Sequence, residues 1–203
     1  MAVSRRKYSP IDLSKVKRYP VLQRHSKVHT KAFGKPLDPK ASARQFFKTL
    51  PQFLKATELR EFIDLTVAAR RKGRPFHVLL GAHTIKVGLS PILIDLMERK
   101  LVTGISFGGA GLVHDLELAF FGGTSEDVQA GLTDGSFGMA RETGELFGEV
   151  ARLAEQQDIG LGEAAGLLIN TKKARFRELS LFATAQRLGL PATIHVGIGT
   201  DIV

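Results

Sequence analysis

The 203-residue sequence contains no cysteine. Disulfide scaffolds, thiol catalysis and cysteine-ligated zinc or iron–sulfur centres are therefore excluded together. No apolar run approaches the roughly eighteen residues that a membrane-spanning helix requires. The first seven residues also lack the apolar stretch of a secretion signal. We therefore expect a cytoplasmic protein that has no membrane partner.

Several catalytic motifs are also missing. The sequence has no Walker loop, no nucleophile elbow and no paired-carboxylate motif. His83, His114 and His195 each fall at or near the end of an expected strand, which raises the question of a metal site. Because no carboxylates accompany them at a metal-binding spacing, we expect none.

The positive charge is confined to the start of the chain. Residues 1–40 hold 11 Lys or Arg against two Asp, which accounts for the whole net charge of +9, and residues 41–203 are balanced. Four prolines and the lack of a helical period predict an extended basic N-terminal arm over residues 1–40. Its few aromatic residues form no stacking platform, so a solvated or subunit-wrapping arm is favoured over nucleic-acid binding.

Residues 41–203 have the length and composition of one globular domain. Apolar runs predict strands at 76–81, 101–107 and 192–196, the first of them buried on both faces. Helical patterns lie between them, including 92–100 after a Ser-Pro start and 112–121. Strand, helix and strand in this order predict a parallel βαβ unit, so the expected fold class is α/β, a parallel sheet flanked by helices.

The segment Gly108-Gly109-Ala110-Gly111 lies between the second strand and its following helix. Ligands of open α/β sheets bind beyond the carboxyl ends of the strands, where glycines allow close approach and helix amides attract phosphate. The segment departs from the dinucleotide fingerprint because His114 stands where the third glycine belongs. Two interpretations remain open, a phosphate-binding turn and a tight strand-to-helix turn without a ligand.

His114-Asp115 is expected in the first turn of that helix. His114 there would act as an acid or base or contact a ligand. Alternatively, the two residues cap and pack, since Asp115 is electrostatically favourable near a helix N-terminus. The sequence does not decide between these interpretations.

Three segments together resemble the deoxyhypusine synthase family. They are residues 80–91 (LGAHTIKVGLSP), 104–115 (GISFGGAGLVHD) and 124–127 (TSED), in matching order and spacing over roughly residues 75–203. Residues 11–20 also look like the opening of bacterial members. The resemblance implies a Rossmann-like NAD-binding fold that assembles as a homotetramer. It also implies that NAD oxidises spermidine and that an enzyme lysine passes the aminobutyl group to a protein lysine.

The resemblance also assigns roles to individual residues. The implied NAD contacts are Thr84, Ser106, Gly108, Gly109, Ala110 and Gly111. Asp201 would hold an amine of the polyamine, and His114 also falls in the implied substrate region.

The chain departs from the family in three respects, the first being that His83-Thr84-Ile85 stands in place of a Thr-Ser-Asn-like loop of eukaryotic members. Val113-His114-Asp115 stands where the family has a Glu-Glu-Asp sequence. With the glutamate lost, the resemblance does not fix spermidine as the polyamine substrate. The family's catalytic lysine lies beyond the position of Val203, so we expect residues 41–203 to form an NAD-binding domain that is incomplete at its C-terminal end. The leading hypothesis is a transferase that moves an aminobutyl group from spermidine or a related polyamine to a lysine or amine acceptor. The alternatives are a non-catalytic NAD-binding or assembly module and a basic-arm nucleic-acid binder.

Overall fold

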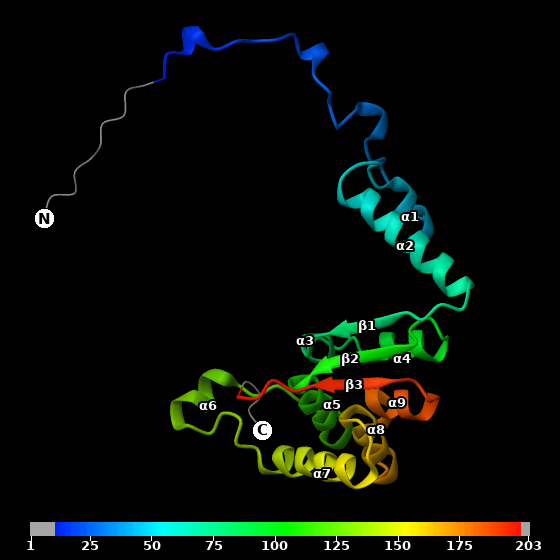
Figure 1. The fold of residues 1–203 in the computed structure, drawn as a ribbon, viewed down its shortest axis with the longest axis vertical. Coiled ribbons are helices and arrows are strands. Elements are labelled where there is room, and N and C mark those ends of the chain that lie inside the picture. The colour runs from blue at the N-terminus through cyan, green and yellow to red at the C-terminus, as the bar shows by residue number, and fades with distance from the viewer. Residues whose placement is uncertain (1–10, 200–203) are drawn as a thin grey trace, which may run out of the picture. The chain divides into compact units, whose positions relative to one another are not determined.

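The computed structural model describes residues 11–199 (Figure 1). Contacts within the chain divide it into two compact units, Met1–Asp64 and Leu65–Val203, and each is described by itself. The predicted boundary at residue 40 falls within the first of these two units, and it stays a prediction. No helix in the described range 11–199 is both long enough and apolar enough to cross a membrane.

The first unit has little interior. Its elements are η1 (Leu13–Lys15), η2 (Val21–Gln23), η3 (Thr30–Ala32), α1 (Ala43–Thr49) and the start of α2 (Lys55–Arg71). Helix α1 begins with a capping box in which Ser42 and Gln45 satisfy each other's backbone amides. Arg60 of α2 donates hydrogen bonds to the carbonyls of Phe47, Leu50 and Pro51 at the end of α1. None of residues 11–64 is buried, so polar contacts such as these connect the helices.

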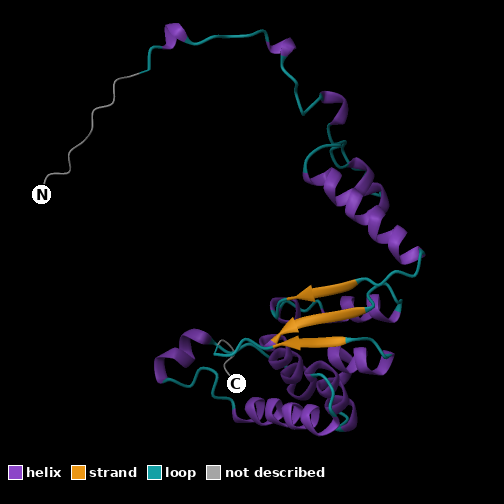
Figure 2. Cartoon of the chain, in the orientation of Figure 1, coloured by secondary structure: helices purple, strands orange, loops and turns teal. Residues whose placement is uncertain are grey.

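The second unit alternates strands and helices, as the sequence predicts (Figure 2). In chain order its elements are β1 (His77–Leu80), α3 (His83–Lys86), α4 (Ser90–Glu98), β2 (Gly104–Gly108), α5 (Gly109–Phe121), α6 (Val128–Asp134), α7 (Arg141–Gln157), α8 (Leu161–Thr171), η4 (Arg177–Leu179), α9 (Leu181–Leu188) and β3 (Ala192–His195). Helix α4 begins one residue earlier than its Ser-Pro signal indicates, because Leu89 occupies the N-cap position.

The three strands form a parallel sheet in the order β1-β2-β3. Leu79 of β1 is level with Ser106 of β2, which is level with Thr193 of β3. The α/β class and the parallel pairing of the first two strands are therefore confirmed. Because the strands are parallel, their carboxyl ends meet at one edge of the sheet (Figure 1).

The two faces of the sheet differ sharply. Ile105 and Phe107 of β2 lie in the core, together with residues of α3, α4, α5, α8 and α9. Alternate residues point to the opposite face, where His77, Leu79, Thr193 and His195 are exposed. The prediction that the first strand is buried on both faces is wrong, because the described helices of this unit cover one face only and Leu79 is 78% exposed.

Close helix packing brings the inner layer together. A Cβ atom on Gly166 of α8 would lie 2.3 Å from the carbonyl oxygen of Phe182 in α9. A Cβ atom on Gly162 would lie 2.2 Å from the carbonyl oxygen of Ala192 in β3. Glycine at these two positions therefore lets α8 pack directly against the backbone of its neighbours.

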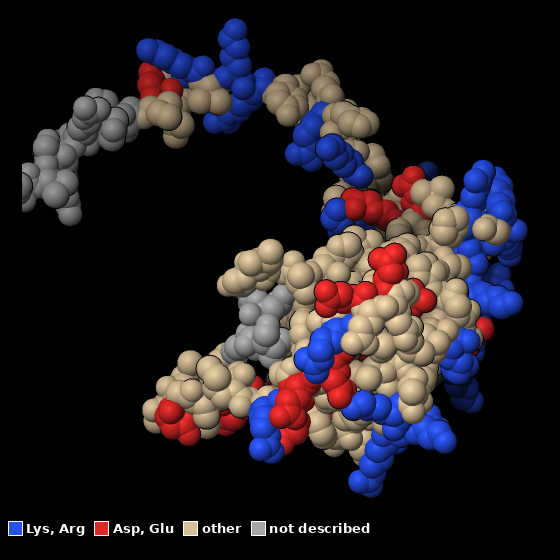
Figure 3. All heavy atoms as spheres, turned by 60° about the horizontal axis from the view of Figure 1, so that its bottom comes forward, with Lys and Arg blue, Asp and Glu red and all other residues tan. Residues whose placement is uncertain are grey.

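Acidic and basic side chains lie side by side over part of the second unit, whereas Arg70, Arg71, Arg99 and Lys100 gather around one pocket. Figure 3 shows Lys and Arg side chains beside Asp and Glu side chains on the face in view. Lys172 pairs with Glu149 at 2.7 Å, and Arg187 pairs with Glu98 at 2.7 Å. These ion pairs agree with the charge balance of residues 41–203.

Candidate functional site

The glycine segment lies at the carboxyl edge of the sheet, at the end of the central strand. Helix α5 begins at Gly109, three residues before the position expected from the sequence, so Gly109, Ala110 and Gly111 form its first turn. Gly108 is the N-cap, with an extended backbone (φ −76°, ψ 172°) and no side chain to cap the helix. The first amides of a helix have no intrahelical partner and carry partial positive charge, so this turn suits an anion.

The glycines of this segment have different structural causes. A Cβ atom on Gly111 would lie 2.7 Å from the side chain of Phe107, so close packing between helix and strand requires glycine there. A Cβ atom on the exposed Gly108 would meet only the carbonyl oxygen of His195, at 3.8 Å. Packing therefore explains Gly111, whereas the open side of Gly108 leaves room for a ligand.

Thr84 lies near the same edge, in the short helix α3 that follows β1. It is half-buried, and its carbonyl oxygen accepts a hydrogen bond from the amide of Leu89. The parallel strands thus bring two of the predicted NAD-contact segments, the start of α3 and the start of α5, to one edge of the sheet.

Asp115 does not face a cleft. It is fully buried, accepts a 2.5 Å hydrogen bond from the Ser180 hydroxyl and a 2.9 Å bond from the amide of Leu181. Desolvation raises its pKa to about 6, against the lowering effect of these hydrogen bonds. Asp115 therefore joins α5 to the N-terminus of α9. It caps a helix, as one interpretation of the sequence expected, but that helix is α9 and not α5, to which Asp115 itself belongs.

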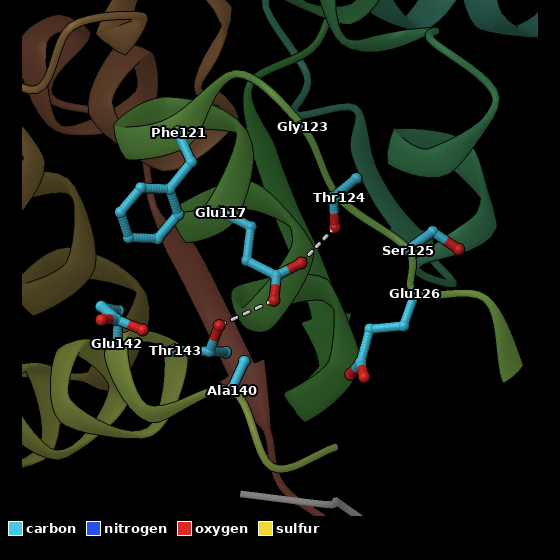
Figure 4. A pocket seen from close by; sticks show the side chains of 9 residues that line it. All are labelled: Glu117, Phe121, Gly123, Thr124, Ser125, Glu126, Ala140, Glu142 and Thr143. Carbon is cyan, nitrogen blue, oxygen red and sulfur yellow. Dashed lines mark hydrogen bonds between the residues drawn. The ribbon is translucent and has the colours of Figure 1, made fainter. Parts of the chain in front are cut away.

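His114 takes part in a separate network at the side of α5. Its Nδ1 atom lies 2.6 Å from the hydroxyl of Thr124, and that hydroxyl donates to the carboxylate of Glu117 (Figure 4). The hydroxyl of Thr143 in α7 donates to the other carboxylate oxygen of Glu117 at 2.8 Å. Thr124 thus belongs to this network, and Asp127 caps α6.

The network holds Glu117 as a hydrogen-bond acceptor. Burial raises the pKa of Glu117, but hydrogen bonds from His114, Thr124 and Thr143 outweigh it, so the net pKa is lowered. Glu117 is therefore an acceptor at neutral pH. Since the single hydroxyl proton of Thr124 goes to Glu117, His114 must donate to Thr124 from Nδ1.

A pocket of about 540 Å³ opens beside this network. Three carboxylates line it, from Glu117, Glu126 and Glu142, together with the ring of Phe121 (Figure 4). Glu126 accepts hydrogen bonds from the amide of Gly138, and Glu142 pairs with Arg141 at 2.7 Å. No Lys or Arg among residues 11–199 belongs to the lining, so the pocket favours a cationic ligand that has apolar carbon to place against Phe121.

Ser106 is not directed at the glycine segment. Its side chain lies on the uncovered face of the sheet, where Oγ is 2.7 Å from His77 Nε2 and 2.6 Å from Thr193 Oγ1. Thr193 in turn is 2.9 Å from His195 Nε2. The predicted NAD contact is thus one member of a polar row across three strands.

Sequence reasoning missed Glu117 and Thr143, and it missed two of the four members of this row, His77 and Thr193. The spacing of His114 and Glu117, three residues apart on a helix, is a signal that would have placed them on one face. Asp201, the predicted polyamine contact, lies outside the described residues. Over residues 11–199, no three His, Asp or Glu side chains gather as they would around a metal ion.

Comparisons with known proteins add little to this picture. No family model matches the chain, and no curated protein matches it in sequence. Similar solved structures include ArgZ, an arginine dihydrolase from the ornithine-ammonia cycle in cyanobacteria, with a TM-score of 0.49 and 19% identity over 75% of this chain and 20% of that chain. Another is a conserved putative LOR/SDH protein from Methanococcus maripaludis S2, with a TM-score of 0.47 and 13% identity over 95% of this chain and 49% of that chain.

The chain therefore spans only a part of each of these two structures, 20% of the first and 49% of the second. Their low identities and TM-scores support no functional assignment.

Proposed function

We propose that this chain is a deoxyhypusine synthase-like, NAD-dependent transferase that removes an aminobutyl group from spermidine or a related polyamine. The observation that carries the proposal is the uncapped N-terminus of α5, which begins at the carboxyl end of the central strand with Gly108 exposed beside it. A Rossmann-like fold places the pyrophosphate of a dinucleotide at such a helix.

NAD fits this edge of the sheet on physical grounds. The open space over Gly108 admits a phosphate close to the backbone, and the first-turn amides at Gly109 and Ala110 supply donors. Thr84 would contact the cofactor from the neighbouring strand end. When bound, NAD would supply a hydride acceptor, and the protein would hold the amine beside it.

The acidic pocket supports an amine substrate. Its carboxylates carry negative charge at neutral pH, which matches an ammonium group, and the Phe121 ring offers an apolar wall for methylene carbons. Glu117 follows Gly109 by eight residues, which is about 12 Å along the helix axis. A polyamine that places one ammonium group at Glu117 and its nearest methylene carbons against Phe121 therefore has to extend at its other end toward the N-terminus of α5 to reach the proposed cofactor.

The remaining parts of the proposal rest on the resemblance. They are the transfer of the aminobutyl group to a lysine or amine acceptor, the homotetramer, and a contact between Asp201 and the polyamine. The alternative is a non-catalytic module that binds NAD or assembles with partners. Both hypotheses allow NAD to bind, but only the transferase would oxidise a polyamine.

Calorimetric titration with NAD tests the cofactor. We expect binding by the native chain and its loss in Gly108→Leu, because the new side chain fills the open space at the helix start. Gly144→Leu is the matched control, since that glycine is exposed in α7 and nothing lies within 4 Å of its Cβ position. Equal affinity for NAD in the native chain and Gly108→Leu would contradict the placement.

Absorbance of NADH tests the chemistry. The chain is mixed with NAD and spermidine, and then with NAD and a diamine, and the rise of NADH is followed. We expect NADH with the polyamine, and a slower rise in Glu117→Gln, which removes the negative charge that the ammonium group needs. NAD binding without NADH from any polyamine would favour the non-catalytic module.

A further inference from the structure

The uncovered face of the sheet carries one continuous row of hydrogen-bonding side chains, here called the outer-face row. It consists of His77 on β1, Ser106 on β2, and Thr193 and His195 on β3. The consecutive distances are 2.7, 2.6 and 2.9 Å, so each member bonds the next. Ser106 is 7% exposed, whereas the two imidazoles at the ends are open to solvent.

The register of the strands builds this row on the diagonal. His77 is level with Gly104, Ser106 with Thr193, and His195 with Gly108. A Cβ atom at position 104 would lie 2.3 Å from His77 Nδ1, so glycine there lets the imidazole lie across β2 and reach Ser106. The row therefore begins at the start of β1 and ends at the carboxyl edge, beside the N-cap of α5.

A count of hydrogens limits the states of the row. Three hydrogen bonds need three hydrogens, and the two hydroxyl groups supply one each. At least one imidazole must then donate from Nε2. If only one does so, every hydrogen is used, all three bonds point the same way, and the row has two equivalent directions.

We propose that the outer-face row is a proton relay, in which His77 and His195 share a single Nε2 proton and always hold opposite tautomers. A proton taken up at His195 Nδ1 sends its Nε2 proton to Thr193, the Thr193 proton to Ser106, and the Ser106 proton to His77 Nε2. His77 then releases its Nδ1 proton to solvent. One proton crosses the sheet, and the row is left in its opposite direction.

The position of the row gives the relay a use. His195 is paired with Gly108, at the edge where the proposed cofactor binds, and His77 lies at the far end of the row. Oxidation of an amine by hydride loss also releases a proton, which has to leave the site. This use rests on the proposed function, whereas the linked tautomers do not.

Nitrogen-15 NMR of the imidazoles tests the relay without cofactor. In alkaline buffer, where both rings are neutral, we expect the Nε2 proton occupancies of His77 and His195 to add up to one. The variant His77→Ala should change the tautomer of His195 in the native background and leave it unchanged in a Thr193→Val background. Thr193→Ser keeps the hydroxyl and should behave as the native chain does.

Two results would overturn the relay. One is Nε2 protonation of both rings in the native chain, because two donors facing each other cannot pass a proton. The other is a His195 tautomer that ignores His77→Ala. Circular dichroism of each variant verifies that the fold is kept.

NADH formation separates the relay from the proposed function. We expect Thr193→Val to lower kcat by about 100-fold relative to Thr193→Ser, the size of a typical proton-transfer contribution. Linked tautomers in a chain that does not bind NAD would refute the proposed function and leave the relay standing. Linked tautomers with equal kcat in both variants would refute the role of the relay in oxidation.

Discussion

Buried Asp115 makes the stability of the second unit depend on pH in an unusual direction. Its carboxylate lies at 0% exposure between α5 and the start of α9, and desolvation raises its pKa from 3.8 to about 6. Because the folded-state pKa is above the unfolded value, the folded protein holds this proton more tightly. The contribution to stability is therefore full below pH 3.8 and is lost as the pH rises through about 6.

The size of the effect follows from the shift. Each pKa unit corresponds to about 1.4 kcal/mol, so a rise of about two units costs about 3 kcal/mol once Asp115 is ionised in the folded state. Asp115→Asn removes the titration. The oxygen of the new side-chain amide still accepts from the backbone amide of Leu181, while its nitrogen donates to the Ser180 hydroxyl, so the connection to α9 is kept.

Urea unfolding of the native chain and Asp115→Asn at about pH 4 and about pH 7 measures this contribution. We expect the variant to gain about 2.4 kcal/mol relative to the native chain between the two pH values, because part of the contribution is already lost at pH 4, above the unfolded pKa of 3.8. Ile169→Val is the control, because this buried residue has no titratable group and should cost about 1 kcal/mol at both. A difference between the native chain and Asp115→Asn that is the same at both pH values would refute the reasoning.

Three other predictions concern the glycine segment, the acidic pocket and the first unit. Gly111→Ala should destabilise the chain by about 1–3 kcal/mol in thermal unfolding, because its Cβ would overlap Phe107, whereas Gly144→Ala should stabilise α7 by about 0.5–1 kcal/mol. The lowered pKa of Glu117 stabilises the fold above the unfolded value of 4.5 and less at lower pH, so the stability difference between the native chain and Glu117→Gln should shrink on acidification. Arg60→Lys should increase hydrogen exchange in α1, because lysine cannot reach three carbonyls at once.

The sequence was informative wherever the signal is local. Apolar runs and turn residues located all three strands of the sheet, and the strand-helix-strand order predicted parallel pairing, because a crossover helix leaves the next strand pointing the same way. Helix starts were less accurate. Helix α5 begins at Gly109 because Gly111 and Phe107 pack together, and helix propensity disfavours the glycines that actually form its first turn.

Contacts between residues far apart in the chain were beyond the sequence. Asp115 and His114 are neighbours, yet one turns into the core to cap α9, 65 residues away, and the other turns outward to Thr124. A helix separates consecutive side chains by about 100°. Whether His114 or Asp115 is buried depends on where α9 packs against α5. The local sequence around these two residues does not contain that information.

The glycine segment shows most clearly which features the sequence determines and which depend on the tertiary structure. The sequence by itself determined that glycines follow the central strand, because backbone freedom and strand ends are local properties. Only the tertiary structure decided that Gly111 serves packing while Gly108 stays open, since the difference lies in the Phe107 ring and in the bare face of the sheet. The same holds for the outer-face row, whose four members become one chain only when the register of three strands aligns them.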